Sequence, residues 1–222
     1  MLLHDVSLQN LHAVFAVDRA GLVGDDGETH HGVFDVGYLD SIPGMTVLAP
    51  ANFAELERML EDAVLHKDGP VAVRYPRGGE GEYKEDSGCA SAVVLRKGGA
   101  MTLVSYGIHI NRVLEAARLL EQHGIQAEVV KLNTITPIDH ETVCSSVQKT
   151  GGLLVAEDCV EAGSVGQRLA AALSERQIKA KIALVNSGRG FVTHGSVPLL
   201  EQELGLDPES LCRKAMEVLK DG

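Results

Sequence analysis

The stretch AVFAVDRAGLVGDDGETHHG, residues 13–32, joins a run of apolar residues to a long polar loop. The run Ala13–Val17 favours a buried β-strand, and the glycines after it permit turns and close approaches that larger residues forbid. In α/β folds, loops at the carboxyl ends of parallel strands bind ligands. This stretch therefore predicts a parallel sheet with a functional loop at its edge.

Outward from this stretch, short apolar segments alternate with amphipathic helical patterns along almost the whole chain. We expect strands at residues 14–17, 46–49, 71–74, 102–104, 128–130, 153–156 and 182–185. We expect helices after the capping residues Asn52, Asp139, Ser164 and Asp207, and a further helical face over residues 110–120. Strands that alternate with helices predict parallel sheets covered by helices on both faces, and so an α/β fold.

Glycine and charged residues dominate the segment 79–99, which is typical of a linker. We therefore expect two parallel-sheet domains, at residues 1–78 and 100–222. The first offers only about three strands, fewer than an average sheet. It is expected to be either a small fold or part of a domain whose remaining strands lie outside this chain.

The composition of the chain limits its partners and its location. A net charge of −11 over 222 residues argues against nucleic acid as the main partner. No apolar run approaches the roughly 20 residues that span a bilayer, and we see no signal peptide, so we expect no membrane partner. The four cysteines are scattered without metal-ligand spacing, which favours reduced thiols in a cytoplasmic protein.

The candidate site residues follow two of the expected strands. Arg19 follows the first strand and Arg77 follows strand 71–74, so both could present a guanidinium group to a phosphate or carboxylate. Asp26 and His30 lie in the loop after the first strand and could transfer protons, because histidine titrates near neutral pH. Together these residues indicate a binding site for a phosphorylated small molecule.

Each of these residues also has a simpler explanation. Arg19 could pair with nearby acids, and Arg77 and the weaker candidate Arg74 could merely end a strand. A zinc site at His30 and its neighbour His31 would lack a third ligand at a sensible spacing, so we expect no metal site. The chain also lacks a GxGxxG or Walker pattern for phosphate binding.

Two of these segments, taken together, indicate one protein family more specifically than either segment does alone. Residues 18–35 (DRAGLVGDDGETHHGVFD) and 69–78 (GPVAVRYPRG) closely resemble the signature of the 1-deoxy-D-xylulose-5-phosphate synthase family, whose members are similar to transketolase. The resemblance continues through residues 38–43, 48–50, 155–158, 163–166, 194–196 and 204–207. It implies a truncated transketolase pyrimidine-binding domain followed by a transketolase C-terminal domain.

The resemblance also implies a reaction. Members of this family condense pyruvate with glyceraldehyde 3-phosphate, with decarboxylation, to supply isoprenoid, thiamine and pyridoxal synthesis. They use thiamine diphosphate and magnesium. Arg19 and Arg77 match the arginines that the family places on the phosphate of glyceraldehyde 3-phosphate. Asp26 and His30 match a pair beside the reacting carbon.

Other parts of the family's pattern have no counterpart in these residues. The catalytic glutamate and the domain that binds the diphosphate and magnesium are both missing. The resemblance therefore implies a C-terminal piece that binds no cofactor alone and is inactive by itself. It implies no catalytic role for Glu157 or Asp158, although the turn 163–166, where a helix opens, could bind an anion.

Two other interpretations remain open. The chain could be the β-type subunit of a two-chain transketolase or 2-oxo-acid dehydrogenase, although such a subunit would also need the missing glutamate. It could instead be a non-catalytic protein that binds a partner or a phosphorylated ligand. In each case the incomplete first sheet predicts exposed apolar edges. We therefore expect self-association into a homo-oligomer, or pairing with the missing N-terminal portion.

Overall fold

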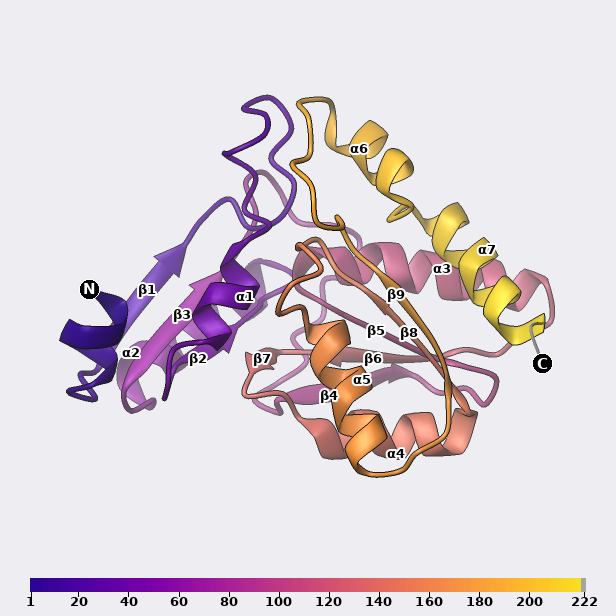
Figure 1. Cartoon of the computed structure of the whole chain (residues 1–222), viewed down its shortest axis with the longest axis horizontal. Helices are drawn as coiled ribbons and strands as arrows, with labels where there is room; N and C mark the ends of the chain where they lie inside the picture. The colour runs from indigo at the N-terminus through magenta and orange to yellow at the C-terminus, as the bar shows by residue number, and fades with distance from the viewer. Residues whose placement is uncertain (221–222) are drawn as a thin grey trace.

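The computed structural model describes residues 1–220, which form two sheets and the helices that cover them (Figure 1). The smaller sheet has the strand order β1-β3-β2-β7, and the larger has the order β4-β6-β5-β8-β9. The predicted α/β fold is therefore confirmed, with two sheets.

The smaller sheet comes mainly from the first third of the chain. Its strands are β1 (Ala13–Val17), β2 (Thr46–Leu48), β3 (Pro70–Arg74) and β7 (Thr134–Thr136). Its helices are a π-helical turn (Leu2–Ser7), α1 (Asp35–Asp40) and α2 (Phe53–Leu65). Strands β1, β3 and β2 are parallel, so the carboxyl ends of β1 and β3 lie side by side.

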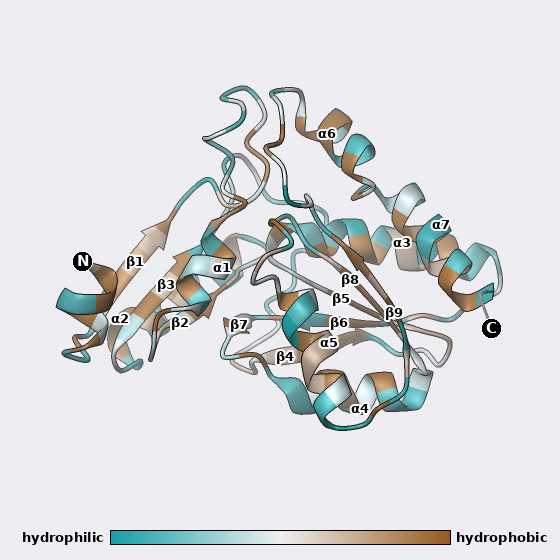
Figure 2. Cartoon of the chain, viewed as in Figure 1, coloured by the Kyte–Doolittle hydropathy of each residue, from teal (hydrophilic) through white to brown (hydrophobic). Residues whose placement is uncertain are grey.

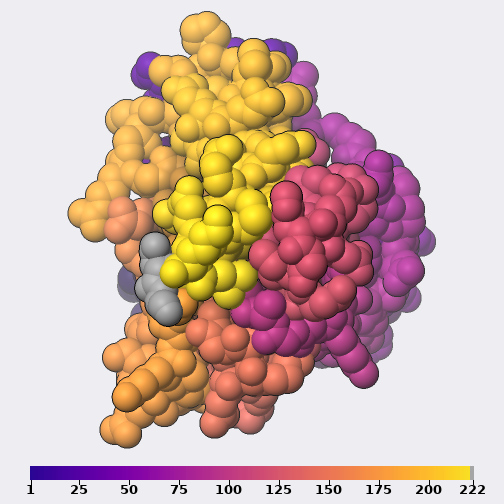
Figure 3. All heavy atoms as spheres, turned by 90° about the vertical axis from the view of Figure 1, so that its right-hand side faces the viewer, coloured from indigo at the N-terminus to yellow at the C-terminus, as the bar shows by residue number. Residues whose placement is uncertain are grey.

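The larger sheet forms the second domain. Its strands are β4 (Ala92–Arg96), β5 (Thr102–Tyr106), β6 (Glu128–Leu132), β8 (Gly152–Ala156) and β9 (Lys181–Val185). The helices are a 3-10 turn (Gly107–His109), α3 (Ile110–Gln122), α4 (His140–Thr150), α5 (Val165–Glu175), α6 (Val197–Leu204) and α7 (Pro208–Lys220). Helices α3 and α7 lie together on one face of the sheet, and α4 and α5 on the other (Figures 1 and 3).

Two strands depart from the parallel pattern. Strand β4 lies inside the segment 79–99, which the sequence indicated as a linker, and it pairs antiparallel with β6. Strand β7 follows directly after β6 but joins the other sheet, antiparallel to β2. Each covers an edge that would otherwise present unpaired backbone groups. The smaller sheet therefore includes residues from both halves of the chain.

The predicted helix caps are confirmed. The side chain of Asn52 accepts a hydrogen bond from the Glu55 N–H, and Asp139, Ser164 and Asp207 accept from the backbone N–H groups three residues later. Such caps satisfy donors that the first turn of a helix leaves unpaired. Helices α1 and α6 were not predicted, because neither carries an apolar periodic run of sufficient length.

The two domains share one hydrophobic core. Val36 and Leu39 of α1 pack in the same buried cluster as Tyr106 and Val155 of the second domain. The strands inside this core are mainly hydrophobic, whereas the loop after β1 is largely hydrophilic (Figure 2). A glycine at position 37 is required at the contact, since a Cβ there would lie 2.6 Å from the Ala162 carbonyl oxygen. None of the helices within residues 1–220 is long and apolar enough to cross a membrane.

Candidate functional site

Residues 18–34 form a loop that leaves the end of β1, and hydrogen bonds join the two sides of the loop near its base. Gly21 and Gly32 each donate a backbone hydrogen bond to the other's carbonyl oxygen, both at 2.8 Å. A Cβ on Gly32 would lie 2.0 Å from the Arg19 carbonyl oxygen, so only glycine fits there. The loop extends toward the segment that precedes α6 (Figure 1).

Arg19 and Arg77 follow neighbouring strand ends. The strands β1 and β3 pair in parallel with Val17 beside Arg74, and the pairing continues because the Ala20 N–H donates to the Tyr75 carbonyl oxygen at 3.0 Å. Both arginines are exposed, and no carboxylate within residues 1–220 lies at ion-pair distance from either. Two guanidinium groups without a carboxylate partner, at the carboxyl ends of two adjacent strands, are suited to binding an anion.

Arg19 also has an unusual backbone. Its φ of +58° lies in the left-handed region, which L-residues other than glycine adopt rarely and at a cost in free energy. The hydrogen bond from Ala20 to Tyr75 fixes the backbone directly after it. Such strain is frequent at functional sites, so this conformation favours a binding role for Arg19.

Asp26 and His30 lie further along the same loop, and both are exposed. The His30 N–H donates to the Gly27 carbonyl oxygen at 3.1 Å, and Thr29 Oγ1 lies 3.2 Å from His30 Nδ1. This contact leaves the Nε2 atom of His30 without a partner among the described residues. Asp26 and His30 therefore share one loop, but no hydrogen bond or ion pair within residues 1–220 joins them to Arg19 or Arg77.

His31 has a structural role. It is buried, its Nδ1 accepts a hydrogen bond from the Val23 N–H at 3.0 Å, and its Nε2 lies 3.2 Å from the Thr193 carbonyl oxygen. These partners require a neutral ring with its proton on Nε2. The Gly195 N–H also donates to the Gly24 carbonyl oxygen at 3.2 Å. The second domain therefore holds the loop that carries Asp26 and His30.

Arg74 is also structural. Its buried guanidinium pairs with Asp35 at 2.8 Å and Asp158 at 3.4 Å, and it lies 5.5 Å from the centre of the Tyr106 ring. Burial alone would lower the pKa of Arg74, but the nearby carboxylates of Asp35 and Asp158 raise it well above its usual value. Arg74 is thus committed to the domain interface and is not available to a substrate.

The glycine-rich turn before α5 is filled by the protein itself. The Glu157 carboxylate accepts hydrogen bonds from the backbone N–H groups of Val165 at 3.0 Å and Gly166 at 2.8 Å, and from the Tyr106 hydroxyl at 3.0 Å. The suggestion that residues 163–166 could bind an anion is therefore wrong. A buried carboxylate already takes the donors of this helix terminus.

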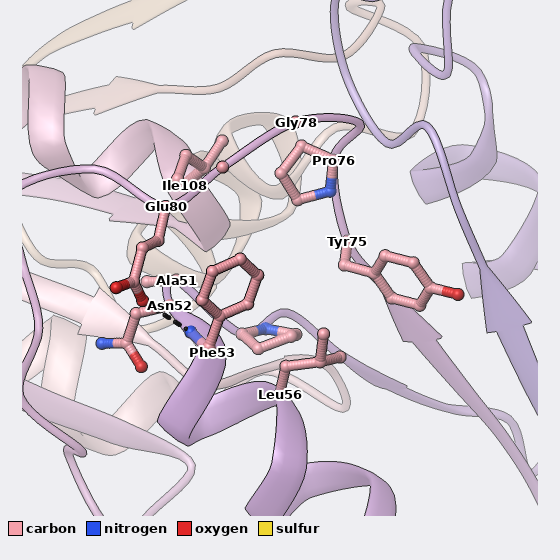
Figure 4. A pocket seen from close by; sticks show the side chains of 11 residues that line it. Ala51, Asn52, Phe53, Leu56, Tyr75, Pro76, Gly78, Glu80 and Ile108 are labelled. Carbon is pink, nitrogen blue, oxygen red and sulfur yellow. Dashed lines mark hydrogen bonds between the residues drawn. The ribbon is translucent and has the colours of Figure 1, made fainter.

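Two hollows lie close to the ends of β1 and β3. A cleft of about 300 Å³ lies between the domains and includes Arg77 among its lining residues. A second, mainly apolar cavity of about 220 Å³ is lined by Phe53, Leu56 and Tyr75, and its Glu80 already accepts a hydrogen bond from the Phe53 N–H at 2.9 Å (Figure 4). Within residues 1–220 no group of three histidine, cysteine or acidic side chains could hold a metal ion.

Comparisons with known proteins identify the family. Residues 1–79 match the transketolase pyrimidine-binding domain, and residues 90–211 match the transketolase C-terminal domain. The chain belongs to the transketolase family.

Relatives within this family share most of the chain. It is 41% identical to a 1-deoxy-D-xylulose-5-phosphate synthase of Chlorobaculum tepidum, over 99% of this chain and 35% of that protein. It is 38% identical to the synthase of Heliobacterium modesticaldum, over 97% of this chain and 34% of that protein. The chain therefore spans about a third of the length of the curated relatives it matches.

A solved structure of a transketolase chain has the same fold as this chain. A chain described as "Split gene transketolase, inactive beta4 tetramer" superposes with a TM-score of 0.86 at 29% identity. The match covers 98% of this chain and 70% of that chain. The predicted resemblance to a transketolase-like family is confirmed by these comparisons and by the two domain matches.

Proposed function

We propose that this chain acts as the C-terminal portion of a 1-deoxy-D-xylulose-5-phosphate synthase. That enzyme joins pyruvate to glyceraldehyde 3-phosphate with loss of carbon dioxide, for isoprenoid, thiamine and pyridoxal synthesis. The observation that carries the proposal is the pair of exposed arginines, Arg19 and Arg77, without a carboxylate partner within residues 1–220, at the ends of adjacent strands. The remaining two-thirds of the enzyme would come from the same or another polypeptide.

In this proposal the loop side chains act on the aldehyde substrate. Arg19 and Arg77 bind the phosphate and thereby fix the position of the aldehyde carbon. His30 donates a proton from Nε2 to the aldehyde oxygen as the carbon–carbon bond forms, and Asp26 accepts a hydrogen bond from the sugar hydroxyl. The loop's attachment to the second domain through His31 keeps both groups in place.

The cofactor would be held mainly outside this chain. When bound, thiamine diphosphate supplies the carbanion chemistry of the reaction. Within residues 1–220 we find neither a metal-ligand cluster nor a free helix terminus at the turn 163–166 that could take its magnesium and diphosphate. We propose that the isolated chain binds no cofactor and is inactive, because it corresponds to only about a third of the length of the synthases it matches.

The experiment is a reconstitution assay. We would mix the purified chain with the N-terminal two-thirds of the Chlorobaculum tepidum relative, pyruvate, glyceraldehyde 3-phosphate, thiamine diphosphate and magnesium. We expect product only from the mixture, and a kcat about a hundredfold lower with Asp26→Asn or His30→Asn. His66→Asn, on the exposed end of α2, is the control and should keep full activity. Robust turnover by this chain alone would refute the proposal.

A second candidate function is the β-type subunit of a two-chain transketolase. The split-gene neighbour favours it, because that chain matches 98% of this one. The two functions differ in one product, since only the synthase reaction releases carbon dioxide from pyruvate. Transfer of a two-carbon unit between sugar phosphates without this release would favour the transketolase subunit. A 2-oxo-acid dehydrogenase subunit would release carbon dioxide from a 2-oxo acid without forming the sugar phosphate product, and a non-catalytic binding protein would show neither reaction.

We also propose that the chain forms a homo-oligomer in the cytoplasm. Strand β1 lies at the edge of its sheet, and the nearby side chains of Leu3, Leu8 and Leu11 are exposed. Such edges and apolar side chains promote association. The four cysteines are free thiols, which suits a reducing compartment. A monomer in analytical ultracentrifugation would contradict the oligomer.

A further inference from the structure

The cleft beside Arg77 brings together residues of both domains. Its first-domain wall includes Ala20, Leu22, Pro76, Arg77 and Gly79, and its second-domain wall includes Ile108, His109, Asn111, Arg112, Asp158 and Glu201. The volume of about 300 Å³ is at the small end of the range for ligand pockets. The cleft connects the ends of β1 and β3 to the first turn of α3.

His109 in this cleft has an unsatisfied polar atom. The side chain is 4% exposed, and its Nε2 has no hydrogen-bond partner within residues 1–220. An unpaired buried polar group costs free energy, which a ligand atom in the cleft could recover. His109 also ends the 3-10 turn that leads directly into α3, so its position is fixed by both elements.

The three acidic residues of the cleft are already paired, and one of them, Glu80, pairs with Lys84. Asp158 Oδ1 lies 3.4 Å from Arg74 Nη1, and Glu201 Oε2 lies 2.8 Å from Arg112 Nη2. Among the lining residues, Arg77 has no carboxylate partner in the described chain, so its charge remains uncompensated. The carboxylates can still accept hydrogen bonds from hydroxyl groups. This combination suits a ligand with a phosphate group and hydroxyl groups.

We propose that the phosphorylated end of the sugar substrate binds in this interdomain cleft, with His109 and Arg112 of the second domain added to Arg77. The inference rests on the proposed function and extends the site into the second domain. His109 Nε2 donates a hydrogen bond to a phosphate oxygen, and Arg112 donates while it remains paired with Glu201. Arg19 does not line the cleft itself, but the next residue, Ala20, does.

The test is a calorimetric titration of the whole chain with glyceraldehyde 3-phosphate, and separately with inorganic phosphate. We expect His109→Leu and Arg112→Gln each to weaken binding about tenfold, since each removes a hydrogen bond to a charged group. The matched controls are His123→Leu, at the exposed C-cap of α3, and Arg118→Gln, on its exposed last turns. The controls should bind as the wild type does.

The outcomes separate this inference from the proposed function. If Arg77→Ala weakens binding but His109→Leu and Arg112→Gln do not, the phosphate site stands and the interdomain site is refuted. If none of the three substitutions matters, both fail. If circular dichroism shows that His109→Leu does not fold, crystals of the wild-type chain soaked in tungstate provide the test instead. Density within hydrogen-bond distance of both Arg77 and His109 supports the inference, and its absence from the cleft overturns it.

Discussion

Two arginines three residues apart at the end of β3 have different roles. Arg74 is buried between Asp35 and Asp158, whereas Arg77 is exposed and lines the interdomain cleft. The strand pattern could place both at the end of a strand, and only the family resemblance ranked Arg77 above Arg74. The buried environment of Arg74 depends on Asp35 and Asp158, which are distant in the chain. The same limit applies to His31, whose partner Thr193 belongs to the second domain.

The role of Arg74 predicts a large effect on stability. Arg74→Gln would leave the buried carboxylates of Asp35 and Asp158 without a cation, and we expect it to lower the free energy of unfolding by about 3–5 kcal/mol. Urea denaturation followed by circular dichroism measures this. The control is Arg189→Gln, which removes an exposed pair with Glu161 and should change little. Equal effects of the two substitutions would show that Arg74 does not hold the interface.

His109 predicts a dependence of stability on pH. Burial lowers the pKa of His109, as does Arg112, while the charges of Asp158 and Glu201 partly offset the shift. Below about pH 6.5 the unfolded chain takes up a proton at this position before the folded chain does, so stability is lost as the pH falls. We expect His109→Asn to lose less stability than the wild type between pH 7.5 and pH 5.5. The exposed control His123→Asn should match the wild type, and an unchanged slope in His109→Asn would contradict the assignment.

At the scale of elements, the loop after β1 depends on the segment before α6. The hydrogen bonds from His31 Nε2 to the Thr193 carbonyl oxygen and from the Gly195 N–H to the Gly24 carbonyl oxygen join the two, although 162 positions separate His31 from Thr193. The position of Asp26 and His30 is therefore controlled from the second domain. Neither the loop's composition nor its glycines could have indicated this.

This attachment can be tested by hydrogen exchange. His31→Leu removes the acceptor of the Val23 N–H, and we expect the amides of Val23 and Gly195 to exchange about five- to tenfold faster, as for the loss of one or two hydrogen bonds. His30→Leu, at the adjacent exposed position, should leave both amides unchanged. If the two variants exchange alike, His31 does not hold the loop.

Regular elements could be predicted where local chemistry decides them. The caps Asn52, Asp139, Ser164 and Asp207 and the buried strands follow from short patterns and were correctly predicted. Strands β4 and β7 could not be predicted in their observed roles, because each is fixed by a partner edge elsewhere in the chain. Helix α1 is too short for a periodic signal and is held by packing of Val36 and Leu39.

At the scale of the whole molecule, the two domains behave as one packed unit. They share a hydrophobic core, the strand β7 and the ion pairs of Arg74, so the second domain both supports the first and borders its site. The sequence predicted the candidate residues of the first domain through a family resemblance. It gave no sign of the second domain's His109 and Arg112, whose significance depends on the cleft.

The most direct measurement is the affinity of the chain for glyceraldehyde 3-phosphate in three forms: wild type, Arg19→Ala and Arg77→Ala. We expect the wild type to bind and each substitution to raise the dissociation constant at least about tenfold, because each removes a charge-assisted contact to the phosphate. Binding that is the same in all three proteins would show that these strand ends form no phosphate site.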